Sequence, residues 1–128
     1  MREYIEKIKE VEISLSKELG EFNLFGLLER EDIIDKWDIL VSLTLSKDKN
    51  HNKQKNSIIK KLHEELIKNL PNSIFFKFSR IVFLEPSNPF VLNINMLANV
   101  QHGDIEIKDS TINNLRIKHA YIISSKRE

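Results

Sequence analysis

The triplet Glu106-Ile107-Lys108 is the stretch of this sequence that fits a catalytic pattern. Two carboxylates can hold a divalent metal ion while a lysine ammonium orients the attacking water, and this arrangement can hydrolyse phosphodiesters. The period of two in a strand sets Glu106 and Lys108 on one face, and Asp38 or Glu85 could supply the second carboxylate. A charged-apolar-charged run is also typical of a half-exposed edge strand. We therefore expect no catalytic or metal site here and keep a metal-dependent hydrolase or nuclease as an alternative.

A second candidate is the basic segment, residues 46–61, which follows an apolar run. It contains one acid, Asp48, and six lysines, among them Lys47, Lys49, Lys53 and Lys55. Where a strand leads into a helix, the free N–H groups at the helix start favour anions. We expect the segment to be exposed and mobile and to form the basic rim of a surface that binds a phosphate or an acidic partner. The alternative is a solvated connector. Without a glycine it cannot form a Walker-type phosphate loop.

Histidines offer a third kind of chemistry, as metal ligands or as acid–base groups. The sequence has four, His51, His63, His102 and His119, and no two are spaced to share a metal ion from one helix face or one strand face. The strongest candidate is His102, because it precedes Gly103 and Asp104 where a strand is predicted to begin. We expect His102 to cap a turn, with a catalytic role as the alternative.

Asp38 and Arg80 each interrupt an otherwise apolar run. A charge inside a covered strand needs a partner, so we expect these two residues to form a salt bridge between neighbouring strands. Glu85 is a competing partner for Arg80. The alternative is a polar site in which Arg80 contacts an anion or a partner.

Hydrophobic periodicity predicts three helices and five strands. Apolar residues recur every three or four positions in residues 2–19 and 54–70, and Asn88-Pro89 is a typical start for a third helix. Strands are predicted over residues 22–28, 37–45, 80–85, 104–108 and 115–124. Residues 73–78 fit either a turn of helix or the approach to a strand.

These elements follow the order α-β-β-α-β-α-β-β. The short polar link between the first two strands predicts an antiparallel hairpin. The strand-helix-strand unit over residues 37–85 predicts a right-handed parallel crossover. We therefore expect a single α/β domain over residues 1–128, with α+β as the alternative, in which a mixed sheet has helices on at least one face.

Composition limits the functional classes. The chain has 128 residues and no cysteine, which excludes disulfides and thiolate metal sites and suits a reducing cytoplasm. Neither a signal peptide nor a membrane span is predicted. Residues 1–45 carry 6 Lys+Arg against 11 Asp+Glu, whereas residues 46–128 carry 14 against 8. The basic segment lacks arginine and aromatic residues, so specific nucleic-acid binding is not expected.

The sequence as a whole predicts a small cytoplasmic protein, without a cofactor, that binds a protein partner or associates with itself. The charge split favours such contacts. Residues 115–124 are apolar on both faces, with Ile117, Tyr121 and Ile123 on one and Ile122 on the other. Such a strand either pairs with a partner chain or packs beneath a helix. A weak nucleic-acid or phosphate-ligand binder is a further alternative.

Overall fold

The computed structural model of the protein describes residues 1–47 and 50–128. All five strands form one mixed sheet in the order β3-β2-β1-β5-β4. Along the chain the elements are the 3-10 helix η1 (Arg2–Tyr4), α1 (Ile5–Leu19), β1 (Leu24–Glu29), β2 (Trp37–Ser42), α2 (His51–Asn69), α3 (Asn72–Phe75), β3 (Phe78–Phe83), α4 (Pro89–Leu97), β4 (Ile105–Ile112) and β5 (Leu115–Ser125). Apart from the short η1 and α3, this is the predicted order, and the predicted α/β class with a mixed sheet is confirmed.

Strand pairing follows from the lengths of the connections. β1 and β2 form the predicted antiparallel hairpin, because a short link allows strands to pair directly. β2 and β3 are parallel, as predicted, and α2 and α3 make the crossover between them. The open choice for residues 73–78 is resolved, since α3 ends at Phe75 and β3 begins at Phe78.

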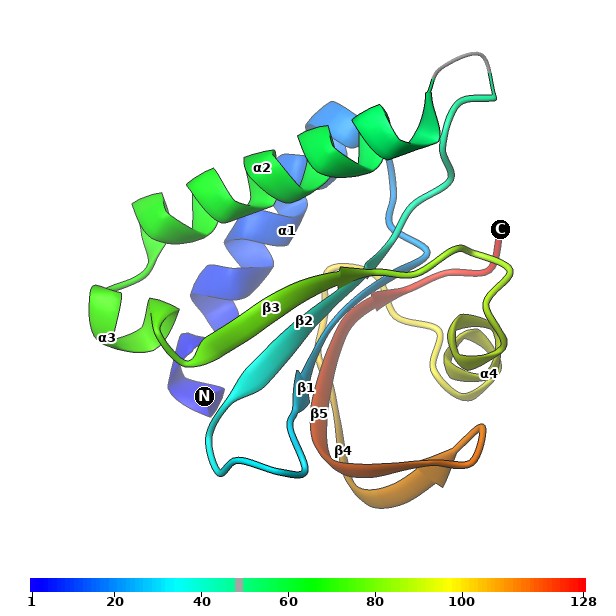
Figure 1. Ribbon diagram of the computed structural model, residues 1–128. Coiled ribbons are helices and arrows are strands. Elements are labelled where there is room, and N and C mark those ends of the chain that lie inside the picture. Colours follow the sequence, from blue (N-terminus) through cyan, green and yellow to red (C-terminus); the bar gives the residue numbers. More distant parts are fainter. Residues whose placement is uncertain (48–49) are drawn as a thin grey trace.

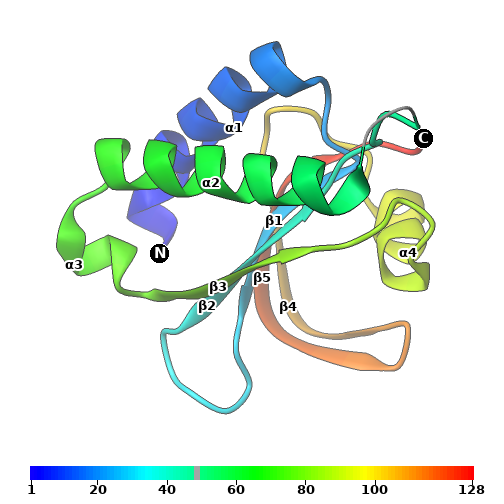
Figure 2. The same ribbon diagram turned by 45° about the horizontal axis from the view of Figure 1, so that its top comes forward.

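Helices cover both faces of the sheet (Figures 1 and 2). α1 and α2 lie together on one face, which we call the α1 face, and α4 lies on the other, the α4 face. The core on the α1 face includes Ile8, Leu15, Leu27, Ile39, Leu62 and Leu66. The core on the α4 face includes Leu24, Leu40, Val91, Ile94 and Ile122. None of the helices that the structure describes is long and apolar enough to cross a membrane.

β5 is apolar on both sides because it lies inside the sheet. Its neighbours are β1 and β4. Tyr121 and Ile123 enter the core on the α1 face, as predicted, and Ile122 enters the core on the α4 face. Ile117, which was predicted to share the face of Tyr121 and Ile123, packs instead in the core on the α4 face. Of the two explanations for residues 115–124, packing beneath helices is the one observed. This strand needs no partner chain to cover it.

The β4–β5 hairpin is longer than predicted. We expected the first strand to end at Lys108 and residues 109–114 to form the turn, but β4 continues to Ile112. Only Asn113 and Asn114 lie between the strands, and both have positive φ, 51° and 63°. A two-residue hairpin turn of type I′ requires positive φ at both positions, which asparagine tolerates better than most residues. The Asn-Asn pair is therefore the sequence signal that the prediction overlooked.

Two boundaries next to the basic segment also differ. The strand predicted over residues 37–45 ends at Ser42, where Leu24 is the last partner that β1 offers. The helix predicted to start at residue 54 begins at His51. Its start is set by Asn50, whose side chain accepts a hydrogen bond from the backbone N–H of Lys53.

Candidate functional site

The side chains of the catalytic pattern around Glu106 and Lys108 do not come together with a second carboxylate. Glu106 and Lys108 share the α1 face of β4, with the Lys108 Nζ 3.8 Å from the Glu106 Oε2. Asp38 is two residues from Leu40, which packs in the core on the α4 face, so its carboxylate lies on the opposite side of the sheet. Glu85, beyond the end of β3, pairs with Lys55. The described residues contain no group of three or more potential metal-ligating side chains.

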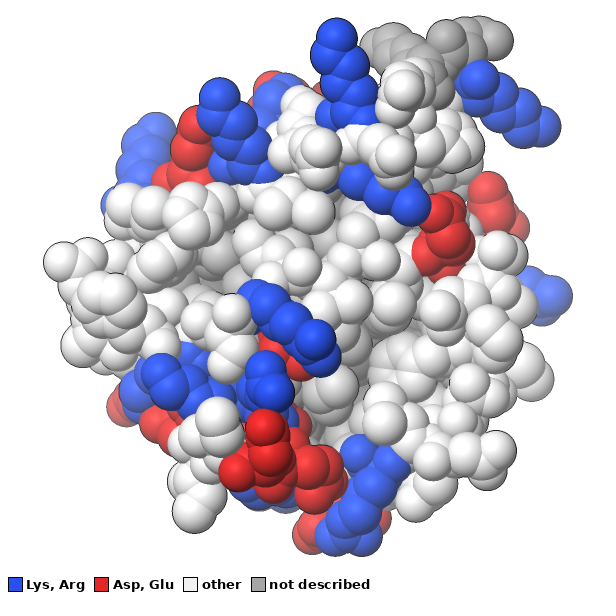
Figure 3. All heavy atoms as spheres, in the orientation of Figure 1, with Lys and Arg blue, Asp and Glu red and all other residues white. Residues whose placement is uncertain are grey.

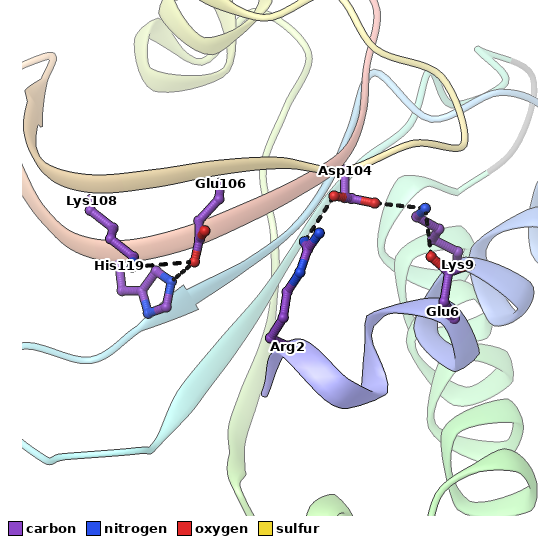
Figure 4. A network of polar contacts seen from close by, with 7 residues as sticks. All are labelled: Arg2, Glu6, Lys9, Asp104, Glu106, Lys108 and His119. Atoms are coloured by element: carbon purple, nitrogen blue, oxygen red, sulfur yellow. Dashed lines mark hydrogen bonds and ion pairs between the residues drawn. The ribbon is translucent and has the colours of Figure 1, made fainter.

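Glu106 instead pairs with His119, which lies on the adjacent strand (Figure 4). Its Oε2 is 2.7 Å from the His119 Nε2, and this contact lowers the pKa of Glu106. The same carboxylate contacts Tyr121, whose pKa is raised to about 12, mainly by burial and then by its hydrogen bond to Glu106. Sequence reasoning missed this cluster, because it depends on the β4–β5 register that the Asn-Asn turn sets.

Asp104 ties the start of the chain to β4 (Figure 4). Its two oxygens lie 2.8 Å from the Arg2 Nη1 and 2.6 Å from the Lys9 Nζ. Hydrogen bonds from Lys9 and Arg2 lower the pKa of Asp104. Glu6 completes the chain of contacts through Lys9. These groups neutralise one another, so this cluster clamps the start of α1 against the sheet.

His102 lies against a buried carboxylate. Its Nδ1 is 2.6 Å from the Oε2 of Glu12, which is fully buried, and its Nε2 is 3.4 Å from Glu21. The other Glu12 oxygen accepts a hydrogen bond of 2.7 Å from the Ser124 hydroxyl. Ser124 is 1% exposed, so a substrate cannot reach its hydroxyl, and these side chains do not present a nucleophile. His102 thus pairs with a buried charge, in a loop where its own φ is 53°.

The basic segment leads from β2 into α2 and lies beside the loop that follows β3, as expected for a parallel crossover. Lys55 contacts Glu85, so the start of α2 is beside the loop that follows β3. Lys47 and Lys53 are exposed, as expected. Lys49 lies outside the described residues. An open cleft of about 850 Å³ separates this segment from the end of α1, and its walls include Leu19, Leu45, Lys53, Ile58 and Lys61.

The predicted pair of Asp38 and Arg80 is formed across β2 and β3. The Arg80 Nε lies 3.2 Å from the Asp38 Oδ2, and the two residues are register partners. The residue Asp38 is only 5% exposed, whereas the Arg80 side chain is 62% exposed. The other Asp38 oxygen, Oδ1, is buried and has no hydrogen-bond partner among the described residues. A buried acceptor left unpaired costs roughly 1–3 kcal/mol, so this oxygen marks the α4 face as a candidate site.

A groove lies directly over this pair. It has a volume of about 270 Å³ and runs across the α4 face from β3 to the tip of the β4–β5 hairpin. Its lining, apart from Asp38 and Arg80, is largely apolar and includes Leu28, Leu40, Val82, Leu84, Phe90 and Leu115.

The two edges of the sheet differ in protection. The β4 edge carries Glu106, Lys108 and Asp109, and charges on an edge strand discourage pairing with another chain. The β3 edge, with the sequence FSRIVF, contains no proline, lysine or acid, and its one charged residue, Arg80, is paired with Asp38 on the neighbouring strand. Among the described residues β2 is the strand that pairs with β3, which lies at the end of the strand order, while α2 and α3 lie alongside β3 (Figures 1 and 2). β3 is therefore the edge that is open to an added strand.

The outer surface of α4 is also apolar. Leu92, Met96 and Leu97 are exposed on it, in addition to the buried Val91 and Ile94. In Figure 3 the right-hand side of the molecule, over α4, is a broad area with few charged side chains. A surface helix normally carries polar residues on its outer side, so this surface is a second region suited to contact with a protein.

Comparison with known proteins adds no functional information. The chain matches no protein family, no curated protein and no solved structure. Inference about its function therefore rests on the geometry of the sheet edge and of the groove on the α4 face.

Proposed function

We propose that this protein is a cytoplasmic interaction domain that binds an extended segment of a partner protein by adding it to the sheet beside β3. The segment would alternate apolar and acidic side chains. Support for the cytoplasmic location comes from the absence of cysteine in the whole sequence. Support for binding comes first from the unprotected β3 edge, and this observation carries the proposal.

The backbone of β3 offers hydrogen bonds to an incoming strand. Leu84 donates its backbone N–H to Val41 of the chain segment beside it. Since successive residues of a strand point their backbone groups to alternate sides, Ile81 and Phe83 direct their N–H and C=O groups away from β2. Main-chain bonds of this kind supply affinity in strand addition, while alternate side chains supply specificity.

The charge next to this edge favours an acidic segment. α2 runs beside β3 in both views (Figures 1 and 2) and carries five lysines against two glutamates. Lys55 reaches the β3 end and lies over the Phe83 ring. Lysine side chains also gather along the upper rim of the molecule, where α2 lies (Figure 3). Acidic side chains of an added strand would face these lysines, and its apolar side chains would face the α4 side.

A second copy of the chain is the alternative occupant of this edge. Sedimentation of the protein alone tests this alternative, because a dimer at micromolar concentration would favour self-association.

Binding can be tested with a blocked eight-residue peptide that alternates valine with glutamate. We expect saturable binding that shifts the backbone amide resonances of β3 more than those of β4. A peptide with lysine in place of glutamate should bind at least tenfold more weakly, because it faces the lysines of α2. If both peptides bind equally, or if the shifts map to β4, the proposal is wrong.

Ser79 provides a matched pair of variants, because it is exposed on β3. Ser79→Glu should weaken binding of the glutamate peptide several-fold by like-charge repulsion, and Ser79→Lys should preserve or strengthen it. Both changes should leave the free energy of unfolding within about 0.5 kcal/mol of the parent. Thermal unfolding checks the stability, and the peptide titration checks the affinity.

The basic segment should contribute through charge. Replacing Lys47, Lys49, Lys53 and Lys55 by glutamine should change the free energy of unfolding by less than about 1 kcal/mol. Lys47 and Lys53 are exposed, Lys55 forms a partly exposed ion pair with Glu85, and such charges contribute little. The same variant should lose most of its retention on a heparin column, and binding of the glutamate peptide should weaken as salt rises above about 0.1 M. A control variant changes an equal number of exposed lysines elsewhere to glutamine, at Lys7, Lys17, Lys108 and Lys126. Equal retention of the two variants would show that the basic segment is only a solvated connector.

A further inference from the structure

We infer that the groove on the α4 face receives one aromatic side chain of the partner segment that adds to β3. This inference rests on the proposed strand addition and names the residue type by which the edge selects its partner. The aromatic residue would stand opposite Val82, with its ring lying along the groove toward Leu115.

The groove adjoins the edge that would take the added strand. Arg80 and Val82 of β3 line it, together with Leu84 just beyond the strand. Ile81 and Phe83, which alternate with these residues, pack against the core on the α1 face. Residues directly opposite each other on neighbouring strands direct their side chains to the same face of the sheet. A residue opposite Val82 therefore directs its side chain to the groove side.

Reach decides which side chain can occupy the groove. Its lining extends past β3 to Leu40 on β2 and Leu28 on β1, which are one and two strands further into the sheet. Neighbouring strands lie about 4.8 Å apart, and side chains at diagonal positions, about 7–8 Å apart, still meet when they are long or aromatic. A valine opposite Val82 would stop at the margin of the groove. An aromatic ring would pass over Val82 and reach the side chains beyond it.

The size and lining of the groove suit a single ring. Pockets for drug-sized ligands measure about 300–1,000 Å³, and this groove is smaller, at about 270 Å³. Its apolar lining includes Leu28, Val82 and Phe90, which are all only half-buried. A ring placed there would remove apolar surface from water on both partners. The polar residues of the lining are Asp38, Arg80, Asn88 and Asn113.

Arg80 favours an aromatic side chain over an aliphatic one. Asp38 is 5% exposed, so Arg80 is the charged group of the lining that an occupant meets. The Arg80 Nε is held 3.2 Å from the Asp38 Oδ2, while 62% of the arginine side chain is exposed. A planar guanidinium stacks on aromatic rings, and this attraction is absent for valine or leucine. The ion pair thus keeps an accessible guanidinium beside the groove.

Three blocked eight-residue peptides test the inference by amide-resonance titration of the full chain. The first alternates valine with glutamate, the second has tryptophan in place of a central valine, and the third has tryptophan in place of the adjacent glutamate. We expect the second peptide to bind about fivefold more tightly than the first and to shift the amides of Leu28 and Leu115 as well as those of β3. The third peptide should gain nothing, because its ring faces the α1 side.

The three peptides also separate this inference from the proposed function. If the valine peptide binds at β3 and the second peptide binds no more tightly, the inference is wrong and strand addition stands. Equal gains for the two tryptophan peptides would likewise overturn the inference, since the ring would then be bound without a specific site. If no peptide shifts the amides of β3, the proposed function is wrong and the inference falls with it.

Variants then assign the gain to the groove, each measured as the ratio of the affinities for the second and first peptides. Leu115→Trp fills the groove from a position that is 45% exposed and should bring this ratio close to one. Leu92→Trp, at a position 38% exposed on the outer surface of α4, is the matched control and should keep the parent ratio. Arg80→Lys keeps the charge but loses the planar group, so it should lower the ratio at least twofold. Parent ratios in both Leu115→Trp and Arg80→Lys would overturn the inference.

Discussion

Replacing His102 by alanine is expected to lower the free energy of unfolding by about 3 kcal/mol, because it leaves a buried carboxylate oxygen without its side-chain hydrogen-bond partner. Glu12 is fully buried, and the imidazole at 2.6 Å is one of its two side-chain partners; the other is the Ser124 hydroxyl. Without the imidazole, the carboxylate would keep only the Ser124 hydroxyl. Urea denaturation of the parent and the variant measures the difference.

A double-mutant cycle separates the buried charge from the loss of contacts. Glu12→Gln removes the charge and keeps the shape, so adding it to His102→Ala should recover more than half of the lost stability. Asp109→Ala is the matched control for backbone strain, since Asp109 also has a positive φ, 47°, and its side chain is 77% exposed. The control should cost less than about 1 kcal/mol, because aspartate already bears part of the left-handed penalty of roughly 1–2 kcal/mol that alanine would bear in full. If His102→Ala costs no more than this control, the pairing with Glu12 contributes no stability.

Leu62→Ala is expected to destabilise the protein by about 2–5 kcal/mol through lost burial and a residual cavity. Leu62 is 0% exposed in the core between α1, α2 and the sheet. A change of this size would make α2, the crossover helix, a main contributor to the stability of the fold.

Ile67 on the same helix provides the control for this prediction. It is 50% exposed, so Ile67→Ala should cost less than about 1 kcal/mol. Chemical denaturation monitored by circular dichroism compares the two variants. Similar losses of stability at both positions would mean that α2 does not pack on the sheet through the face that carries Leu62.

The elements themselves were largely predictable, because hydrophobic period is a local property of the chain. The stripe of α1 through Ile8, Val11 and Leu15 is buried as predicted, and Gly20 ends the helix with a φ of 102°. Pairing of β1 with β2 and of β2 with β3 was predictable too, since these strands are linked by a short loop and by a single crossover. The extent of β4 was not predicted, because its end depends on two asparagines that were assigned to a longer turn.

Some features of the candidate sites could also be predicted from the sequence, and others could not. The pairing of Asp38 with Arg80 followed from two charges inside apolar strands, but the unpaired Oδ1 and the groove over it did not. Glu12 reads in sequence as a solvated residue of an amphipathic helix, yet it is buried because His102 and Ser124 approach it from distant parts of the chain.

The sequence by itself determined the presence and order of the three longer helices and the five strands, the α/β class and the place of the basic segment after β2. These depend on side-chain period and on short connections. Only the tertiary structure decided that β5 enters the sheet between β1 and β4, that β3 is left as an open edge, and that Glu106 and Asp38 lie on opposite faces. Those outcomes depend on contacts such as Leu27 with Tyr121, between residues far apart in the sequence. Such long-range contacts form because both faces of the sheet must be covered by other parts of the chain. The local pattern of residues along a strand does not specify which partners it will meet.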